Sequence, residues 1–217
     1  MNSVVLAGAT GLIGQQVISQ LVVSPDVERI VALTRRTSEI TYDAKLSWQH
    51  SDPLTVPNTV KANVGLICLG TTLRQAGSKQ ALRRVDVDLV VAIAQQMKQA
   101  GVTRLGVISS HGANPHHLSH YLRCKGQMEQ ALEQLDFEHL TIVRPGPLKG
   151  ERENPRFDEL LLQKVVNRVQ PMMKGPLANL VPIDAQAVAR ALWQTTLEST
   201  AKRCIVSAKD LHQPTAK

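Results

Sequence analysis

The chain has 217 residues, of which 43% are hydrophobic and only 3% aromatic, and its 25 basic and 18 acidic residues give a net charge of +7. This length suits one sizeable α/β domain with a single core and leaves little room for two full domains. Basic residues occur at most in pairs without interleaved aromatics, which favours a solvated basic surface and a phosphate site over a nucleic-acid footprint.

The sequence also bears on where the protein works. Met1 leads directly into an apolar run that ends at a glycine-rich turn, which predicts no secretory signal peptide. The longest apolar runs are too short to cross a membrane. Three widely separated cysteines, Cys68, Cys124 and Cys204, are typical of reduced thiols and not of a disulfide framework. We therefore expect a cytoplasmic protein that binds neither membrane nor nucleic acid.

The first expected strand, residues 3–7, runs into G-A-T-G-L-I-G at Gly8 to Gly14, and a helix is expected over 12–23. Such glycines let the backbone turn tightly and approach a pyrophosphate, which rests on free N–H groups at the helix N-terminus. No G-K-[ST] follows, so this is not a nucleotide-triphosphate loop. Three glycines can form a plain turn, but at the first strand–helix junction they favour a dinucleotide site.

The second expected strand, residues 29–33, is followed by Thr34, Arg35 and Arg36. An acidic residue at this point would bind the ribose hydroxyls of NAD, whereas an arginine favours the additional phosphate of NADP. The alternative is that both arginines are ordinary surface residues. We expect NADP(H) to be preferred over NAD(H).

Further alternation follows, with strands expected over 46–48 and 64–69 and a helix over about 78–100 that ends at Gly101. The inner stripe of that helix is expected to consist of Leu82, Val85, Leu89, Ile93 and Met97. Continuous apolar strands between helices predict an α/β fold with a doubly wound, mostly parallel sheet. In such sheets ligands bind at the carboxyl ends of the strands.

The strand expected over 104–109 ends at Ser109 and Ser110, and the next helix carries Tyr121 and Lys125. Residues four apart share one face of a helix. A tyrosine alone is a poor acid–base catalyst at neutral pH, but a neighbouring ammonium stabilises its phenolate. Because a hydroxyl at the end of this strand can orient a substrate carbonyl, these residues predict a Ser-Tyr-Lys site.

Four of the seven histidines precede that tyrosine: His111, His116, His117 and His120. Two of them, four residues apart, could bind zinc on one helical face. No cysteine or carboxylate at suitable spacing completes the shell, so we favour a solvated loop at the mouth of the site and expect no metal. Cys124 is expected to face away from its neighbour Lys125 and to be a structural thiol.

The alternation weakens after a strand expected over 139–143. Residues 151–180 are rich in charge, proline and methionine and predict a small substrate-covering subdomain, with a helix near 158–169, inside a single domain of residues 1–217. A helix over 184–197 and a strand over 203–207 are expected to close the chain.

Together these segments resemble the short-chain dehydrogenase/reductases, which combine a G-x-x-G-x-x-G loop, a serine and Tyr-x-x-x-Lys. Within them the chain is most similar to the atypical branch typified by the HIV Tat-interacting oxidoreductase-like protein and its bacterial relatives. The likeness covers most of the chain and includes C-L-G-T-T-L-R-Q-A-G (68–77), R-V-D-V-D (84–88), S-S-H-G-A-N (109–114), Y-L-R-C-K-G-Q-M-E (121–129), R-P-G-P-L-K-G (144–150) and V-P-I-D-A-Q-A-V-A (181–189).

The resemblance implies a Rossmann-type domain in which Tyr121 is the acid–base group, Lys125 lowers its pKa and holds the ribose, and Ser110, or less favourably Ser109, orients the carbonyl. The N-N-A-G segment of the classical enzymes is absent, so their asparagine-based proton relay does not carry over. The residues expected at the cofactor, from motif or resemblance, are Gly8, Thr10, Gly11, Leu12, Ile13, Gly14, Arg35, Arg36, Asp52, Leu69, Gly70, Thr71, Thr72, Lys125, Pro145, Gly146 and Leu148.

We therefore expect an NADP(H)-dependent oxidoreductase that acts on an unidentified small carbonyl or alcohol. One alternative is an NADPH-binding regulatory or assembly factor that works through a protein partner without turnover. A second is a sugar-nucleotide epimerase-like enzyme, although the segment after the sixth strand is short for a nucleotide-sugar domain.

Overall fold

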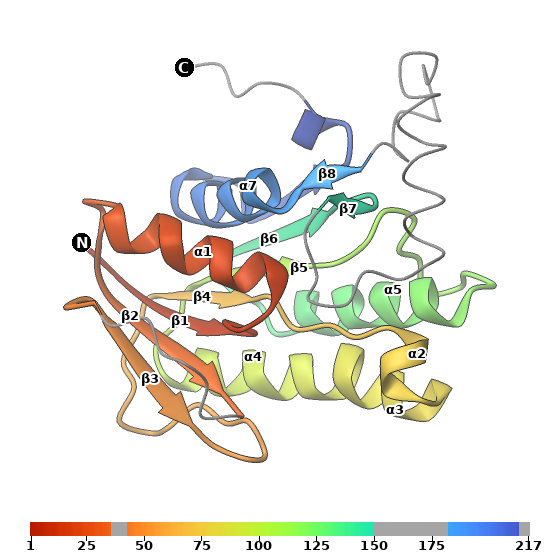
Figure 1. Ribbon diagram of the computed structural model, residues 1–217, viewed down its shortest axis with the longest axis horizontal. Helices are drawn as coiled ribbons and strands as arrows, with labels where there is room; N and C mark the ends of the chain where they lie inside the picture. Colours follow the sequence, from red (N-terminus) through yellow and green to blue (C-terminus); the bar gives the residue numbers. More distant parts are fainter. Residues whose placement is uncertain (36–42, 150–181, 213–217) are drawn as a thin grey trace.

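A parallel sheet organises the computed structural model, which describes residues 1–35, 43–149 and 182–212 (Figure 1). In this part of the chain seven strands pair in the order β3-β2-β1-β4-β5-β6-β9, all parallel. The strands are β1 (Asn2–Ala7), β2 (Val27–Thr34), β3 (Leu46–His50), β4 (Val64–Ile67), β5 (Arg104–Ile108), β6 (His139–Arg144) and β9 (Arg203–Ser207). The predicted doubly wound α/β fold is confirmed, and the strand order reverses between β1 and β4, where such sheets bind ligands.

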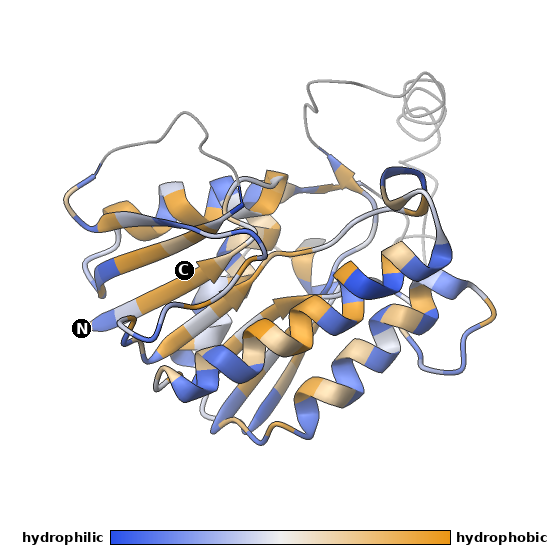
Figure 2. Cartoon of the chain, turned by 90° about the horizontal axis from the view of Figure 1, so that it is seen from below, coloured by the Kyte–Doolittle hydropathy of each residue, from blue (hydrophilic) through white to orange (hydrophobic). Residues whose placement is uncertain are grey.

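Helices cover both faces of the sheet. α1 (Leu12–Val23) and α7 (Ala185–Glu198) lie on one face, and α4 (Val90–Gln99) and α5 (His120–Glu133) lie on the other (Figure 1). Successive residues of a strand point to opposite faces of the sheet and so belong to different core layers. In β1, Val4 and Leu6 pack toward α1 and α7, whereas Val5 and Ala7 pack toward α4 and α5. Figure 2 shows these strands as apolar along their length, as expected for a sheet buried on both faces.

The segment expected as one helix over 78–100 is not a single regular helix. It consists of α3 (Lys79–Arg83), a π-helical segment η1 (Arg84–Leu89) and then α4, with the short α2 (Leu73–Ala76) before it. A π-helix holds more residues in each turn than an α-helix, so it rotates the side chains that follow. Val85 and Leu89, expected on the inner stripe, are therefore only partly buried, while Asp86 and Val87 turn inward.

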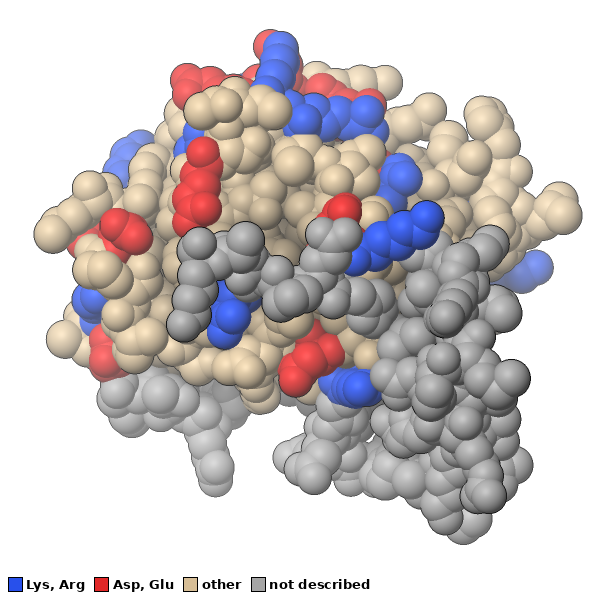
Figure 3. Space-filling view, turned by 90° about the horizontal axis from the view of Figure 1, so that it is seen from above, with Lys and Arg blue, Asp and Glu red and all other residues tan. Residues whose placement is uncertain are grey.

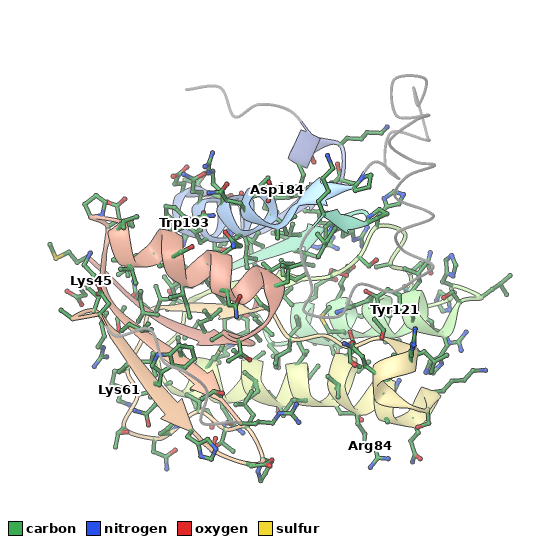
Figure 4. The ribbon with its side chains drawn as sticks, viewed as in Figure 1. Lys45, Lys61, Arg84, Tyr121, Asp184 and Trp193 are labelled. Atoms are coloured by element: carbon green, nitrogen blue, oxygen red, sulfur yellow. The ribbon has the colours of Figure 1, made fainter. Side chains whose placement is uncertain are left out.

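The C-terminal part adds elements that the sequence did not indicate. A two-stranded sheet pairs β7 (Leu148–Lys149) with β8 (Ile183–Asp184), and a 3-10 turn spans Asp210–His212. Trp193 Nε1 on α7 donates a hydrogen bond of 2.8 Å to Gln20 Oε1 on α1, which joins the two helices of one layer (Figure 4).

The predicted substrate-covering subdomain over 151–180, with its helix near 158–169, lies outside the described residues. Among the helices that are described, none combines the length and the apolar character that a membrane span requires. On the face drawn in Figure 3, the described basic and acidic side chains are interspersed and form no broad patch of one sign.

Candidate functional site

The turn between β1 and α1 has a geometry that only glycine allows. Gly8 has a φ of +83°, and a Cβ there would lie 2.6 Å from the backbone carbon of Cys68. A Cβ on Gly14 would lie 2.1 Å from the Gly8 carbonyl oxygen, so strand and helix approach each other through these two residues. Backbone therefore packs directly against backbone at these two glycines.

This turn fits an anionic ligand at the start of α1. Gly11 is the N-cap of the helix, in an extended conformation with φ −79° and ψ 167°, and no side chain caps the helix. The first turn of α1 contains no acidic residue. Because the first N–H groups of a helix have no partner within it and carry partial positive charge, they can hold the pyrophosphate of a dinucleotide.

A second stretch of backbone faces the same edge of the sheet, after β4. Thr71 N donates a hydrogen bond of 2.9 Å to Asp86 Oδ2, and Thr72 caps α2 by accepting from Gln75 N. Gly70 is exposed, and a Cβ on it would lie 3.5 Å from both Asp86 Oδ1 and Lys125 Nζ. The loop after β4 is thus held directly beside a buried charged pair.

The structure brings Tyr121 and Lys125 together on α5, beside this loop. Lys125 Nζ lies 6.0 Å from the centroid of the Tyr121 ring and 2.7 Å from Asp86 Oδ1. It also donates to the carbonyl oxygen of Ile108, at the end of β5, over 3.4 Å. Lys125 and Asp86 are buried and Tyr121 is half-buried. In Figure 4 Tyr121 lies on α5 near α2, whereas Arg84 of the π-helical segment extends away from the sheet, on the outer side of the layer formed by α4 and α5.

Lys125 carries its charge at neutral pH. Burial alone would lower the pKa of its amine, but the carboxylate of Asp86, with Tyr121 and Glu129 in support, raises that pKa above its ordinary value. Asp86 Oδ1 has the Lys125 ammonium as its ion-pair partner and forms no hydrogen bond of regular geometry within the described part of the chain.

The two candidate serines differ in what their hydroxyls contact. Ser109 is buried and donates to Glu129 Oε1, and Glu129 is in turn held by Arg144, whose Nε lies 3.0 Å from the same oxygen. Hydrogen bonding to this carboxylate raises the pKa of the Arg144 guanidinium. Ser110 is only partly buried and has a long contact of 3.4 Å with the carbonyl oxygen of His111. Ser110 is therefore the better placed of the two to meet a substrate.

Sequence reasoning missed two residues of this cluster, Asp86 and Glu129. Glu129 was detectable in principle, because it follows Tyr121 and Lys125 at the same spacing of four and so lies on their helix face. Asp86 was less detectable, because it reaches the site only through the rotation that the π-helical segment introduces.

The remaining predicted cofactor residues follow the carboxyl ends of the strands. Arg35 is exposed at the end of β2, where its carbonyl oxygen lies 2.9 Å from His50 Nε2; Arg36 lies outside the described residues. Asp52 is exposed after β3. In the β1–α1 turn Thr10 is exposed, whereas the side chain of Ile13 is buried in the core.

Three further predicted residues follow β6. Of the remaining two, Leu69 follows β4 and Leu12 begins α1. Pro145 is buried and its carbonyl oxygen accepts from His111 N at 2.8 Å, Gly146 is half-buried, and Leu148 begins β7. Leu69 and Leu12 are half-buried and pack against opposite core layers. Most of the predicted residues within the described ranges thus lie on loops or helix starts that follow the carboxyl ends of the strands, whereas Lys125 lies within α5 and Leu148 on β7.

The histidine segment packs on the start of α5. His120 Nε2 lies 3.0 Å from the carbonyl oxygen of Lys79, and His111 and His116 are exposed. The described ranges contain no group of three or more histidine, cysteine, aspartate or glutamate residues arranged to hold a metal ion. Cys124 is buried in the core layer under α5, and burial raises the pKa of its thiol.

These features define the class of protein. The sequence pattern of the NAD(P)H-binding family matches residues 8–165. "Protein FMP52, mitochondrial" from Candida albicans is 32% identical over 196 residues, which cover 87% of this chain and 85% of that protein. The protein of the same name from Coccidioides immitis is 32% identical over 209 residues, covering 88% and 84%. The chain belongs to the NAD(P)H-binding family, with the fungal FMP52 proteins among its relatives.

Solved structures support the same fold. The chain superposes on MoeE5, determined in complex with UDP-glucose and NAD, with a TM-score of 0.68 and 17% identity, covering 96% of this chain and 79% of the other. For the PhqB reductase domain from Penicillium fellutanum the TM-score is 0.66 with 21% identity, covering 94% and 66%. At these identities the similarity establishes the Rossmann-like fold alone, while the likeness to the Tat-interacting branch stays a prediction.

The predicted location of the protein was wrong. A cytoplasmic protein was expected, whereas the relatives from Candida albicans, Coccidioides immitis and Saccharomyces cerevisiae are all named as mitochondrial proteins. The opening residues were interpreted only with respect to secretion and so carried no information about this destination.

Proposed function

We propose that the protein is an NADP(H)-dependent oxidoreductase of the short-chain dehydrogenase/reductase type that acts on a small carbonyl or alcohol through Ser110, Tyr121 and Lys125. The observation that carries this proposal is the placement of Tyr121 beside a buried, charged Lys125 at the edge of the sheet where the glycine turn also lies. An acid–base role for Tyr121 is what distinguishes this proposal from a protein that only binds the cofactor.

Each residue has a role that follows from its surroundings. When bound, NADPH supplies a hydride to a carbonyl carbon. Tyr121 then donates its phenolic proton to the carbonyl oxygen, and the Lys125 ammonium stabilises the phenolate that remains. The hydroxyl of Ser110 holds the carbonyl oxygen in line with Tyr121. The hydroxyl of Ser109 donates a hydrogen bond to Glu129, so Ser109 stabilises the end of β5 instead.

The proposed preference for NADP(H) over NAD(H) depends on Arg35. Its guanidinium is exposed at the end of β2, where a ribose phosphate would be met by a charge-assisted hydrogen bond. We expect calorimetric titration to show tighter binding of NADPH than of NADH by roughly 1–3 kcal/mol, and Arg35→Ala to remove most of that difference.

Arg29→Ala is a matched control for this titration, because Arg29 lies on β2, the strand that Arg35 follows, and its side chain contacts Ser3 and Lys61 instead. It should leave the preference unchanged. Equal affinities of the native protein for NADPH and NADH would contradict the assignment of Arg35.

The reductase proposal is tested by consumption of NADPH with a panel of small aldehydes and ketones. The expected result is steady oxidation of NADPH with at least one carbonyl, with one alcohol formed for each NADPH consumed. Tight NADPH binding without oxidation across aldehydes, ketones and, in the reverse direction, alcohols would favour the regulatory factor that binds NADPH without turnover.

A further inference from the structure

Asp86 is a buried carboxylate to which the proposed chemistry gives no task. It lies in the π-helical segment, and its side chain is 0% exposed. A carboxylate buried without a compensating partner destabilises a protein by several kcal/mol, so its position calls for a specific pairing. The pairing that it makes joins two parts of the site which are distant in the sequence.

The two oxygens of Asp86 have different partners. Oδ2 accepts a hydrogen bond of 2.9 Å from the backbone N–H of Thr71, in the loop after β4. Oδ1 lies 2.7 Å from Lys125 Nζ on α5. Gly70 lies against this pair without a side chain, and a Cβ there would be 3.5 Å from both charged atoms. The carboxylate thus holds the loop and the lysine in one fixed relation.

We propose that Asp86 is a positioning residue of the cofactor site, which holds the Lys125 ammonium in place and fixes the loop at Gly70 and Thr71 beside it. The inference rests on the proposed NADP(H) site. In this chain a buried carboxylate contacts the lysine directly.

The charge of Lys125 depends on this contact. The groups that face its amine are Asp86 from the π-helical segment, Tyr121 and Glu129 from α5, and the Ile108 carbonyl oxygen from β5. Burial lowers the pKa of the amine, and Asp86 is the strongest of the groups that raise it. With asparagine at position 86 we expect the effect of burial to prevail, so that the amine loses its proton at a lower pH.

The first experiment measures NADPH affinity of the full chain by fluorescence titration between about pH 6 and pH 9, a range in which an ordinary lysine is charged. The native protein should show no change that arises from Lys125. Asp86→Asn should bind NADPH on the order of tenfold more weakly at neutral pH, with a further loss as pH rises. The matched control is Asp88→Asn, on the same segment but exposed beside Arg83, and it should behave as the native protein.

The second experiment uses no ligand and follows the free energy of unfolding against pH. In the native protein the pKa of Lys125 is raised, so its stabilisation is complete below the ordinary value of 10.5 and is lost only as pH rises through the folded-state pKa. In Asp86→Asn the carboxylate no longer opposes the effect of burial, so we expect the pKa of the amine to fall below its ordinary value. The unfolded chain would then bind more protons, and stability should increase as pH rises toward 10.5. Affinity and stability of this variant should therefore change with pH in opposite directions.

A double variant keeps the inference testable if Asp86→Asn does not fold. Asp86→Asn with Lys125→Met contains no unpaired buried charge, so it should be more stable than either single variant, and its stability should show no pH dependence from this pair. Additive losses in the double variant would contradict the proposal, because Asp86 would then act on the loop alone.

The outcomes separate this inference from the proposed function. If Asp86→Asn has the same two pH profiles as the native protein while NADPH binds, Asp86 does not control Lys125 and the inference is wrong, although the function stands. If the native protein binds no NADPH, the proposed function is wrong, and the unfolding profiles still decide whether Asp86 sets the charge of Lys125.

Discussion

Tyr121→Phe should lower turnover by a factor on the order of 10² or more while leaving NADPH affinity and the fold nearly unchanged. The variant removes one oxygen from a half-buried ring that packs against the core layer under α5, so the packing of the ring is retained. The missing hydroxyl is the group that we propose to donate the proton. The measurement is kcat with a carbonyl substrate identified from the panel, together with an NADPH titration and a thermal unfolding curve.

The control for this variant is Tyr42→Phe, because the chain has only two tyrosines. It makes the same chemical change at the other tyrosine, to which the proposal gives no role, and should keep native turnover. A Tyr121→Phe protein that retains full activity on a genuine substrate would show that the acid–base group lies elsewhere.

Gly11→Val should abolish NADPH binding in a protein that still folds. The extended backbone of Gly11 suits a valine, and its Cβ would lie 3.3 Å from the Gly8 carbonyl oxygen, which requires only a small local adjustment. The branched side chain would, however, project at the N-terminus of α1, where we expect the pyrophosphate. The circular dichroism spectrum should remain close to native while calorimetric titration detects no binding.

Gly14→Ala provides the contrast, since its Cβ would lie 2.1 Å from the carbonyl oxygen of Gly8 and the backbone would have to move. This variant should lose thermal stability as well as binding. Normal NADPH affinity in Gly11→Val would mean that the cofactor binds away from the start of α1.

Sequence reasoning succeeded where the information is local. The alternation of apolar strands and amphipathic helices, the glycine turn after β1 and the spacing of Tyr121 and Lys125 each depend on residues within one or two turns of backbone. The burial of a parallel sheet on both faces makes its strands continuously apolar, which is a strong signal even in a chain so poor in aromatic residues.

Sequence reasoning failed where a residue acts through a contact distant in the chain. Asp86 resembles an ordinary charged residue in a solvated helix, and its burial follows from an extra residue in one helical turn, which periodicity cannot detect. Ser109 was an open alternative to Ser110 because only tertiary structure reveals that Glu129 occupies its hydroxyl. The pairing of β7 with β8 joins strands of two residues each, too short for any pattern to indicate.

The most direct test of the account is a crystal structure of the full chain with NADPH bound. The account predicts the pyrophosphate at the N-terminus of α1, the ribose phosphate at Arg35, and the nicotinamide ring within reach of the Tyr121 hydroxyl and the Lys125 ammonium. A cofactor bound at another edge of the sheet, or a nicotinamide ring directed away from Tyr121, would contradict the proposal that this site reduces a carbonyl.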